Sequence, residues 1–258
     1  MKILITGGNG YIASTLLKEL TGLHQVTSIT RQIFDLTNST VTSAWFKDKE
    51  FDVVIHTAID GGSRLRNDTF STLDNNLRMY YNLLDNHQSF KRFISIGSGA
   101  ELFQQHTPYG MSKHVIRHSI LEKDNFYNVR VFAVFDEHEL DTRFIKANVR
   151  RYINKEPMSI HKDKRMDFFY MKDFVNVIKY YISDNKPPKE FDCSYQQHLY
   201  LSEIVEFINT LSHYKVNVVF DNQGYTLPYT GMFTNLNLPF IGLHQGIQHV
   251  YNTLLCKI

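Results

Sequence analysis

The sequence predicts an α/β fold in which a doubly wound parallel sheet is covered by helices on both faces. The first observation is that short apolar runs alternate with amphipathic helical patterns as far as residue 136. The second is the opening stretch, where the uncharged run Ile3–Ile5 leads directly into the glycine-rich Thr6–Gly10 and then into a helical pattern. The third is that the alternation weakens after Asp136, which predicts a small C-terminal lobe.

The opening glycine turn has the properties of a nucleotide-binding element. Gly7 allows a sharp turn after the strand, and Gly10 leaves room for a pyrophosphate near the backbone N–H groups at the start of the helix. Ala13 occupies the position of the small residue that packs the helix on the strand. The alternative is that these glycines only make a turn. Because they lie between a clear strand and a clear helix, we predict a dinucleotide-binding Rossmann fold.

The remaining elements follow in order. Further strands are expected at 25–30, 51–58, 92–98 and 128–135, with helices at 41–46, 69–87 and 109–121. Beyond them we expect helices at 144–152, from 173 to 182, at 201–211 and at 246–255, and a strand at 215–220. We assign a dinucleotide-binding domain to 1–136 with part of 165–200. A small substrate-binding lobe is assigned to 137–164 and 200–258, packed over the carboxyl ends of the sheet.

Composition excludes several classes of protein. Of 258 residues, 43% are hydrophobic and 21% are charged, and the formal net charge is +2, so the chain has the composition of a globular protein without a nucleic-acid or membrane surface. Cys193 and Cys256 have no metal or redox spacing and fit a reducing compartment. A strand beginning at residue 2 leaves no room for a signal peptide, so we expect a cytoplasmic protein.

The end of the second strand bears on the type of dinucleotide. NAD-binding folds usually place an acidic residue there, which accepts hydrogen bonds from the ribose 2′-OH. This chain has Thr30 and Arg31 instead, and a hydroxyl with a guanidinium suits a 2′-phosphate. We therefore favour NADP(H) over NAD(H), with the alternative that Arg31 is a solvated loop residue. Thr57 and Ala58, at the end of the third strand, are small enough to lie along the cofactor.

A second informative stretch contains Tyr109 and Lys113. Four residues apart on a helix, the two side chains project from the same face. A cation close to a phenol favours the phenolate, so such a pair can exchange a proton with a carbinol oxygen near neutral pH. The spacing alone arises often by chance in a tyrosine-rich chain, and the position after the fourth strand gives it weight. The alternative for Tyr109 is a buried tyrosine at the start of a helix.

Together these stretches resemble the extended short-chain dehydrogenase/reductase family, the NAD-dependent epimerase/dehydratase group that acts on nucleotide sugars. The residues that carry the resemblance are Thr6–Ala13, Asp35-Leu36, His56–Ala58, Asn76, Ser98, Tyr109 with Lys113, and Arg130–Phe132. The stretch from Met166 to Asp173 resembles the family signature RDFxxVxD, with Met166 in place of its arginine. The resemblance covers nearly the whole chain and is more specific for fold and cofactor than for reaction.

The resemblance implies roles for individual residues. The turn Thr6–Ala13 would hold the pyrophosphate, Asp35 and Leu36 would flank the adenine, and Lys113 would bind the nicotinamide ribose. Tyr109 would be the acid/base, and Ser98 would hydrogen-bond the reacting sugar oxygen, unless it is only a turn residue. The predicted catalytic residues are Ser98, Tyr109 and Lys113. The predicted cofactor-binding residues are Thr6, Gly7, Gly10, Tyr11, Ile12, Thr30, Arg31, Asp35, Leu36, Thr57, Ala58, Tyr109 and Lys113.

Departures from the family pattern narrow the reaction that the resemblance implies. The 4,6-dehydratases of the family carry Asp-Glu directly after the catalytic hydroxyl residue, whereas Ser98 is followed by Gly99 and Ala100. Reductases that also epimerise use a cysteine near this serine, and neither cysteine of this chain lies there in the sequence. The resemblance is then closest to the nucleotide-linked 4-keto-6-deoxysugar 4-reductases of the rhamnose type. Their substrate would be a UDP- or dTDP-linked hexose or a 2-acetamido sugar, and a homodimer fits the resemblance.

Two other functions and several charged residues stay open. A 4-epimerase with tightly bound NAD would use the same residues, and an NADP-binding sensor or scaffold would bind without catalysis. His114 and His118 share a helix face, but the glutamate and third ligand of a zinc site are missing from the pattern, so packing or solvation is favoured. Arginines that could contact a nucleotide diphosphate, although each alone suits an ordinary surface charge, are Arg64, Arg66, Arg143, Arg150 and Arg165.

Overall fold

The computed structural model describes residues 1–62, 67–184 and 186–256. By its internal contacts the chain divides into two compact units. The first comprises Met1–Arg130 with Tyr180–Phe191, and the second comprises Val131–Lys179 with Asp192–Ile258. Each unit has its own hydrophobic core, and the two are described separately below.

The first unit is built on a six-stranded sheet. Its strands are β1 (Lys2–Thr6), β2 (Gln25–Ile29), β3 (Phe51–His56), β4 (Phe90–Ser98), β5 (Phe126–Val131) and β9 (Glu190–Asp192). They lie in the order β2-β1-β3-β4-β5-β9, and β1 pairs in parallel with both β2 and β3. Opposite Ile5 lie Ser28 on one side and Ile55 on the other. The parallel sheet predicted from the sequence is confirmed.

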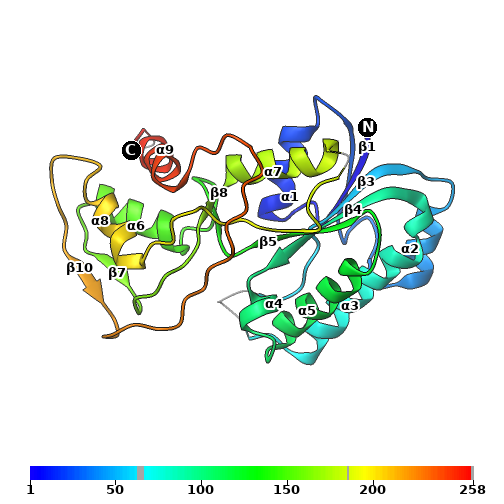
Figure 1. Cartoon of the computed structure of the whole chain (residues 1–258), viewed down its shortest axis with the longest axis horizontal. Coiled ribbons are helices and arrows are strands. Elements are labelled where there is room, and N and C mark those ends of the chain that lie inside the picture. The colour runs from blue at the N-terminus through cyan, green and yellow to red at the C-terminus, as the bar shows by residue number, and fades with distance from the viewer. Residues whose placement is uncertain (63–66, 185, 257–258) are drawn as a thin grey trace. The chain divides into compact units, whose positions relative to one another are not determined.

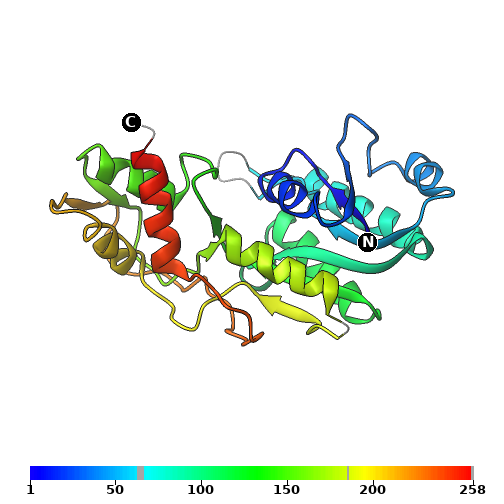
Figure 2. The ribbon, with the colours of Figure 1, turned by 90° about the horizontal axis from the view of Figure 1, so that it is seen from above.

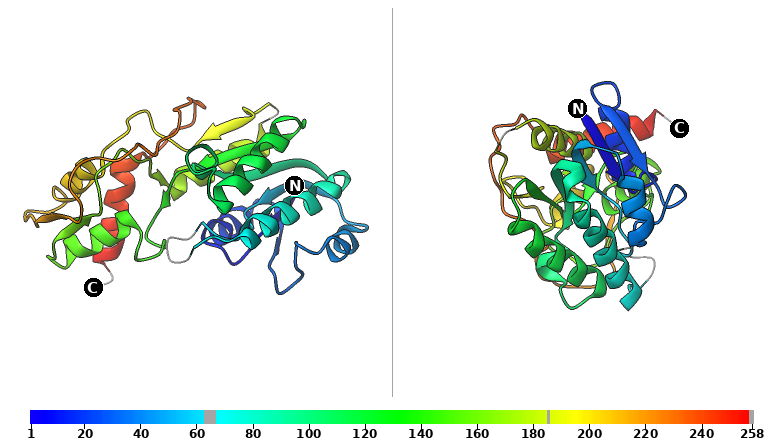
Figure 3. Two further views of the ribbon diagram at one scale, coloured as in Figure 1. Left: turned by 90° about the horizontal axis from the view of Figure 1, so that it is seen from below. Right: turned by 90° about the vertical axis from the view of Figure 1, so that its right-hand side faces the viewer.

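Helices cover both faces of this sheet. The helix α1 (Tyr11–Leu20) lies on one face, and α2 (Ser39–Phe46), α3 (Phe70–Asp85) and α5 (Pro108–Leu121) lie on the other, with α3 against α5 (Figures 1 and 3). A short helix, α4 (Ala100–Phe103), follows β4, and a 3₁₀ turn occupies His87–Ser89. The start of α5 is defined locally. Thr107 accepts a hydrogen bond from the N–H of Gly110, and proline at the first helical position lacks the N–H that would otherwise be unpaired.

Burial of apolar strands and aromatic rings stabilises the first unit. Leu4, Val54 and Phe93, at the centres of three neighbouring strands, are fully buried. The ring of Phe93 stacks on that of Phe126, with 4.9 Å between ring centroids. Burying each such side chain contributes roughly 1.5–3 kcal/mol. This continuous core fixes the position of the strand ends, where the candidate site lies.

The second unit contains two small sheets and a group of helices. The strand β7 (Met158–Ile160) pairs with β10 (Val218–Phe220), and β6 (Val134–Phe135) pairs with β8 (Phe169–Tyr170). The helix α9 packs against α6 (Figure 2). The buried apolar residues of the second unit form a core of their own, separate from the core around the six-stranded sheet. The bounds of its helices are α6 (Phe144–Ile153), α7 (Met171–Ser183, which ends in the first unit), α8 (Leu201–Ile208) and α9 (Leu243–Leu255).

Several predicted elements differ from those observed. The strand expected at 128–135 is two strands, because β5 belongs to the six-stranded sheet whereas β6 pairs with β8. The strand expected at 215–220 is limited to Val218–Phe220, and the helix expected at 201–211 ends at Ile208. The edge strand β9 follows a Pro-Pro turn and has three residues, too few for a periodic signal.

Among the described residues, no helix combines the length and the apolar character that crossing a bilayer requires.

Candidate functional site

The carboxyl ends of β1 and β3 are joined by a hydrogen-bonded cluster around Thr6. The Thr6 hydroxyl oxygen accepts from the backbone N–H of Thr57 at 3.2 Å and of Ala58 at 3.1 Å. It also lies 2.8 Å from Nδ1 of His56, and Thr57 donates its own hydroxyl to the Thr6 carbonyl at 2.6 Å. With two N–H groups donating to the Thr6 oxygen, its own hydrogen points at His56, so the ring proton of neutral His56 resides on Nε2.

The glycine turn after β1 is tightly constrained by this strand end. Gly7 has φ of +72°, the left-handed region that favours glycine, and a Cβ there would lie 2.7 Å from the Cα of Ala58. At Gly8 an added Cβ would lie 2.1 Å from Oγ of Ser28. The turn therefore requires glycine at position 7, whereas a side chain at position 8 would have to displace the Ser28 hydroxyl.

The turn leads into the start of α1, a position that favours an anion. Gly10 is the N-cap of α1 and has no side chain with which to cap the first N–H groups of the helix. The helix dipole favours a negative group at this end. Beneath the turn, Oγ of Ser28 is buried and is the one buried side-chain polar atom without a partner among the described residues. The start of a helix directly after the constrained Gly7 turn fits a dinucleotide pyrophosphate.

The loop after β2 lies beside the glycine turn but is loosely held. Asn9 in the turn donates to Gln32 in the loop at 3.2 Å. Arg31 forms an ion pair with Asp35 at 3.6 Å, with the two side chains 69% and 43% exposed. The other carboxylate oxygen of Asp35 accepts from the N–H and the hydroxyl of Thr37, and that backbone bond chiefly holds the pKa of Asp35 below its usual value. An exposed pair of this kind is weak, so a ligand phosphate can compete for Arg31.

The helix α5 carries Tyr109 and Lys113. The Lys113 ammonium is buried and donates to the carbonyl of Ile96 on β4 at 2.6 Å. The ring of Tyr109 lies against Gly62 in the loop after β3, where an added Cβ would lie 2.8 Å from the ring. Because an ammonium has three N–H donors, Lys113 retains hydrogens for a ligand after its bond to Ile96.

Burial is the main influence on the pKa values of Lys113 and His56. Burial lowers the pKa of Lys113 to about 8, and the charge of Glu101 acts in the opposite direction. Burial also lowers the pKa of His56 to about 3, with a further contribution from the positive charge of Lys113. At neutral pH Lys113 is therefore charged beside a neutral His56, and its charge is poised to titrate within a physiological range.

Asn76 connects three elements of the site. Its side chain accepts from the N–H of Asp60 at 2.8 Å and donates to the Asp60 carbonyl at 2.9 Å. It also donates to the hydroxyl of Ser112 at 3.0 Å, and Ser112 donates to the carbonyl of Tyr109 at 2.7 Å. The loop after β3, the helix α3 and the first turn of α5 are thus held in one arrangement.

Ser98 is the last residue of β4. Its Oγ accepts from the N–H of Ala100 at 3.2 Å. Among the contacts of the described residues none takes the hydroxyl hydrogen of Ser98, so that hydrogen can be donated to a ligand oxygen. His56 pairs with Ser95 in the parallel register of β3 and β4, so Ser98 lies at the same edge of the sheet as the Thr6 cluster.

The remaining residues predicted to bind the cofactor or the substrate lie in different parts of the fold. Leu36 packs in the hydrophobic core, and its carbonyl accepts from Asn82 at 2.7 Å. Tyr11 and Ile12 form the first turn of α1, and Thr30 directly follows β2. The arginines Arg64 and Arg66 lie outside the described residues. In the second unit, Arg150 pairs with Asp141, and Arg165 lies over the ring of Tyr200.

The family of the chain follows from a comparison with family models. Residues 3–194 match the model of the NAD dependent epimerase/dehydratase family. The chain belongs to this family. The match spans every residue predicted for the site, including Tyr109 and Lys113. A search of curated proteins gave no significant match.

Solved structures from this fold group align over almost the whole chain. A GDP-mannoheptose C4 reductase from Campylobacter jejuni with NADP bound has a TM-score of 0.81 at 15% identity, covering 98% of both chains. A GDP-D-glycero-L-gluco-heptose synthase from the same organism, in the presence of NADPH, has a TM-score of 0.79 at 15% identity, covering 97% of both. A UDP-glucuronic acid 4-epimerase from Bacillus cereus in complex with UDP-glucuronic acid and NAD has a TM-score of 0.79 at 19% identity, covering 100% of both chains. At these identities the likeness establishes the fold.

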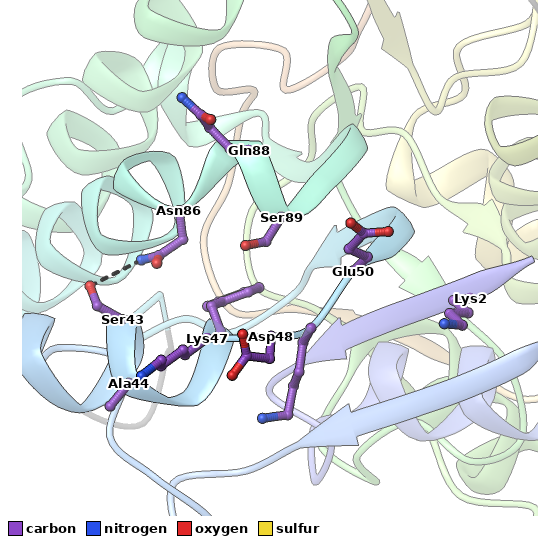
Figure 4. Close-up of a pocket in the computed structure, with 11 residues that line it drawn as sticks. Lys2, Ser43, Ala44, Lys47, Asp48, Glu50, Asn86, Gln88 and Ser89 are labelled. Atoms are coloured by element: carbon purple, nitrogen blue, oxygen red, sulfur yellow. Dashed lines mark hydrogen bonds between the residues drawn. The ribbon is translucent and has the colours of Figure 1, made fainter.

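Two further features of the chain are not part of the candidate site. The rings of His114 and His118 lie 4.5 Å apart, and among the described residues no group of three or more potential metal ligands gathers. A surface hollow includes Lys2, Ser43 and Asn86, whose side-chain amide donates to the Ser43 hydroxyl (Figure 4). It lies at the amino ends of the strands, the opposite edge from the glycine turn.

Sequence reasoning assigned no role to a buried group of charged residues near Ser98. Glu101 on α4 is fully buried, and its carboxylate contacts Asn128 and Arg130 of β5. From the sequence alone, a glutamate three residues after a strand end is interpreted as an ordinary surface charge. The signal that could have revealed it is Arg130, a charged residue within the buried strand β5, which requires a buried partner.

Proposed function

We propose that the protein is an NADPH-dependent reductase of the C4 keto group of a nucleotide-linked sugar. The observation that carries this proposal is the arrangement of α5, where Lys113 is buried against β4 and Tyr109 lies on the same face of the helix. Ser98, at the end of β4, offers its hydroxyl hydrogen at the same edge of the sheet. The family match and the nucleotide-sugar enzymes among the structural neighbours support the substrate class.

Each residue has a defined part in this reaction. When bound, the reduced nicotinamide supplies a hydride to the carbonyl carbon. Tyr109 gives its phenolic proton to the carbonyl oxygen, and the charge of Lys113 stabilises the phenolate that remains. Ser98 donates a hydrogen bond to the same oxygen and so orients the carbonyl. The Thr6–Ala13 turn would hold the pyrophosphate through N–H groups of α1.

Reduction without further proton transfers agrees with the surroundings of Ser98. Glu101 is the carboxylate nearest to Ser98 in the sequence, and its contacts with Arg130 and Asn128 leave it buried rather than open to a substrate. A dehydratase needs an additional acid or base beside the hydroxyl residue, and Glu101 is not placed to serve as one. A single hydride transfer needs none.

The cofactor and the substrate lobe are also part of the proposal. Arg31 and Thr30 would bind the 2′-phosphate of NADP(H), because the Arg31 guanidinium is exposed and only weakly paired. The second domain of the sequence analysis, residues 137–164 and 200–258, would bind the nucleotide sugar. The expected sugars are 4-keto-6-deoxyhexoses linked to UDP or dTDP.

The test is an NADPH-oxidation assay on a panel of 4-keto nucleotide sugars linked to UDP, dTDP and GDP. We expect oxidation of NADPH with one of them and a product reduced at C4, identified by NMR. Protein that purifies with bound NAD and interconverts C4 epimers without consuming NADPH would instead be an epimerase. Cofactor binding with neither reaction would indicate a sensor or scaffold.

A further inference from the structure

Two successive glycines in the loop after β3, Gly61 and Gly62, have backbone conformations that favour glycine. Their φ angles are +79° and +68°, both in the left-handed region. A side chain at either position would therefore strain the backbone, whatever space surrounds it. The two positions differ, however, in the part of the first unit that a side chain would meet.

Gly62 lies against the reactive end of the Tyr109 ring. Although Gly62 is exposed to solvent, a Cβ added to it would point at the ring and lie 2.8 Å from both Cε2 and Cζ. Cζ is the carbon that bears the phenol hydroxyl. A Cβ on Gly61 would instead meet the side chains of Asp68 and Thr72 at the start of α3. The absence of a side chain at position 62 thus leaves room for the Tyr109 ring.

The glycine turn is held by polar contacts with α3 and with the residues just before that helix. The N–H of Gly62 donates to Oδ1 of Asp68 at 2.9 Å. Two residues before Gly62, the backbone of Asp60 exchanges two hydrogen bonds with the buried side chain of Asn76. The carboxylate of Asp60 also accepts from the side chain of Asn75 at 3.0 Å. The turn therefore has a defined position that does not depend on its contact with Tyr109.

The backbone of Tyr109 is fixed by the same asparagine. Nδ2 of Asn76 donates to the hydroxyl of Ser112 at 3.0 Å, and that hydroxyl donates to the carbonyl of Tyr109 at 2.7 Å. With the backbone held, the position of the phenol hydroxyl depends on the side-chain torsions of Tyr109. Contact of the ring with Gly62 restricts those torsions on one side.

We propose that Gly62 is a positioning residue, which sets the Tyr109 ring so that the phenol hydroxyl meets the substrate carbonyl. This inference rests on the proposed function for the role of Tyr109. A side chain at position 62 would occupy space that the ring now fills, and the ring would rotate away because the turn is fastened to α3. Proton transfer requires hydrogen-bond distance between donor and acceptor, so a displaced ring impairs the chemical step and spares cofactor binding.

The contact is tested without activity, by ¹⁹F NMR of protein labelled with 3-fluorotyrosine. The Tyr109 resonance is identified by its loss in Tyr109→Phe, and we expect it to shift in Gly62→Ala. Gly224→Ala is the matched control. Its φ of +81° imposes the same kind of backbone strain, but an added Cβ there meets no atom within 4 Å, so the Tyr109 resonance should stay in place. An unmoved resonance in Gly62→Ala, or an equal shift in Gly224→Ala, would overturn the contact.

The effect on the reaction is tested by steady-state kinetics with NADPH. In Gly62→Ala we expect kcat to fall about tenfold or more at an unchanged KM for NADPH, because the hydroxyl is displaced and the cofactor site is not. In a Tyr109→Phe background the same change should have no further effect on kcat, because the hydroxyl that it would displace is gone. Losses that multiply in the double variant would show that Gly62 acts independently of Tyr109, and would refute the positioning role.

Asp68 offers a pair of variants that add no atom to the turn. Asp68→Ala removes the acceptor of the Gly62 N–H, whereas Asp68→Asn keeps an oxygen there, so we expect kcat to fall in the first and to be retained in the second. This pair serves also if Gly62→Ala does not fold, and equal kcat in both variants would count against positioning by the turn. A protein that is not a reductase would oxidise no NADPH in any variant, while the ¹⁹F resonance would still decide the contact.

Discussion

Two regions of the candidate site differ strongly in how deeply their side chains are buried. The reaction region, Ser98, Tyr109 and Lys113, lies at the end of β4 and on α5, and Lys113 is 6% exposed with its ammonium on a backbone carbonyl. The loop region, Thr30, Arg31 and Asp35, follows β2, and its Arg31 side chain is 69% exposed in a 3.6 Å ion pair. The first region combines the buried Ser98 and Lys113 with the half-buried Tyr109, whereas the second contains an exposed ion pair.

The degree of burial explains why the two regions differ in the residue types that they allow. A buried ammonium needs a hydrogen-bond acceptor and a compensating charge, so the reaction region tolerates few alternatives. An exposed ion pair contributes about 0–1 kcal/mol, so the loop region can change without cost to the fold. Lys113 is therefore the more constrained part of the candidate site, and the exposed loop around Arg31 is the part whose residues can vary.

The largest expected effect is in the reaction region. Tyr109→Phe removes the proton donor but keeps the ring against Gly62, so we expect kcat to fall by about 10²- to 10⁴-fold. NADPH affinity, measured by fluorescence titration, should change little. Tyr81→Phe on α3, an exposed tyrosine 40% accessible to solvent, is the control and should retain full activity. Unimpaired turnover in Tyr109→Phe would show that the reaction region does not carry the chemistry.

The glycine turn contacts both strand ends, so a change there should disturb both regions. In Gly7→Ala the positive φ and the contact with Ala58 both oppose the new methyl group, and we expect at least about 1–2 kcal/mol of destabilisation with weaker cofactor binding. Thermal unfolding and NADPH titration measure the two effects. Gly22→Ala is the control, because an added Cβ there meets no atom within 4 Å. Equal behaviour of the two variants would contradict the strain assigned to Gly7.

A change in the loop region should alter cofactor choice alone. Arg31→Ala removes a charge-assisted bond to the 2′-phosphate, so we expect KM for NADPH to rise about tenfold or more while KM for NADH and the melting temperature stay constant. Steady-state kinetics with both cofactors provide the measurement. Arg78→Ala, which breaks the comparable exposed pair with Asp74 on α3, is the matched control. If both variants left NADPH kinetics unchanged, Arg31 would be a solvated loop residue.

The smallest effect is a pH dependence that belongs to the reaction region. The pKa of Lys113 is about 8, so its ammonium is present below that pH and is lost above it. We expect kcat/KM to be constant near pH 7, where Lys113 is charged, and to decline above pH 8. One pH unit above 8 it should be about tenfold lower. A profile of kcat/KM between pH 6 and 10 measures this limb. A profile flat to pH 10 would mean that Lys113 does not titrate in the free enzyme.

Several residues could be predicted from the sequence for clear physical reasons. A parallel strand buried on both faces is an uninterrupted apolar run, and a sharp strand-to-helix turn needs glycine, so β1, Gly7 and α1 are all visible in the first stretch. Tyr109 and Lys113 were found because helical spacing places side chains four apart on the same face. Short strands without a period, such as β8 and β9, were missed.

Long-range contacts decided the rest. Glu101 and Arg130 are 29 residues apart, and Asn76 and Ser112 are 36 apart, so no local pattern relates them. The contact between Gly62 and Tyr109 likewise depends on how the loop after β3 and the start of α5 meet. Such partners are chosen by sheet order and helix packing, which periodicity does not specify.

By itself, then, the sequence determined the parallel sheet, the glycine turn and the pair of Tyr109 and Lys113, because each depends on neighbours within a few residues. Only the tertiary structure decided that Lys113 is buried, that His56 is neutral beside it, and that Glu101 lies beneath Ser98. The physical reason is that burial and electrostatic environment are properties of the assembled sheet. They arise only when strands distant in the chain bring their carboxyl ends to one edge.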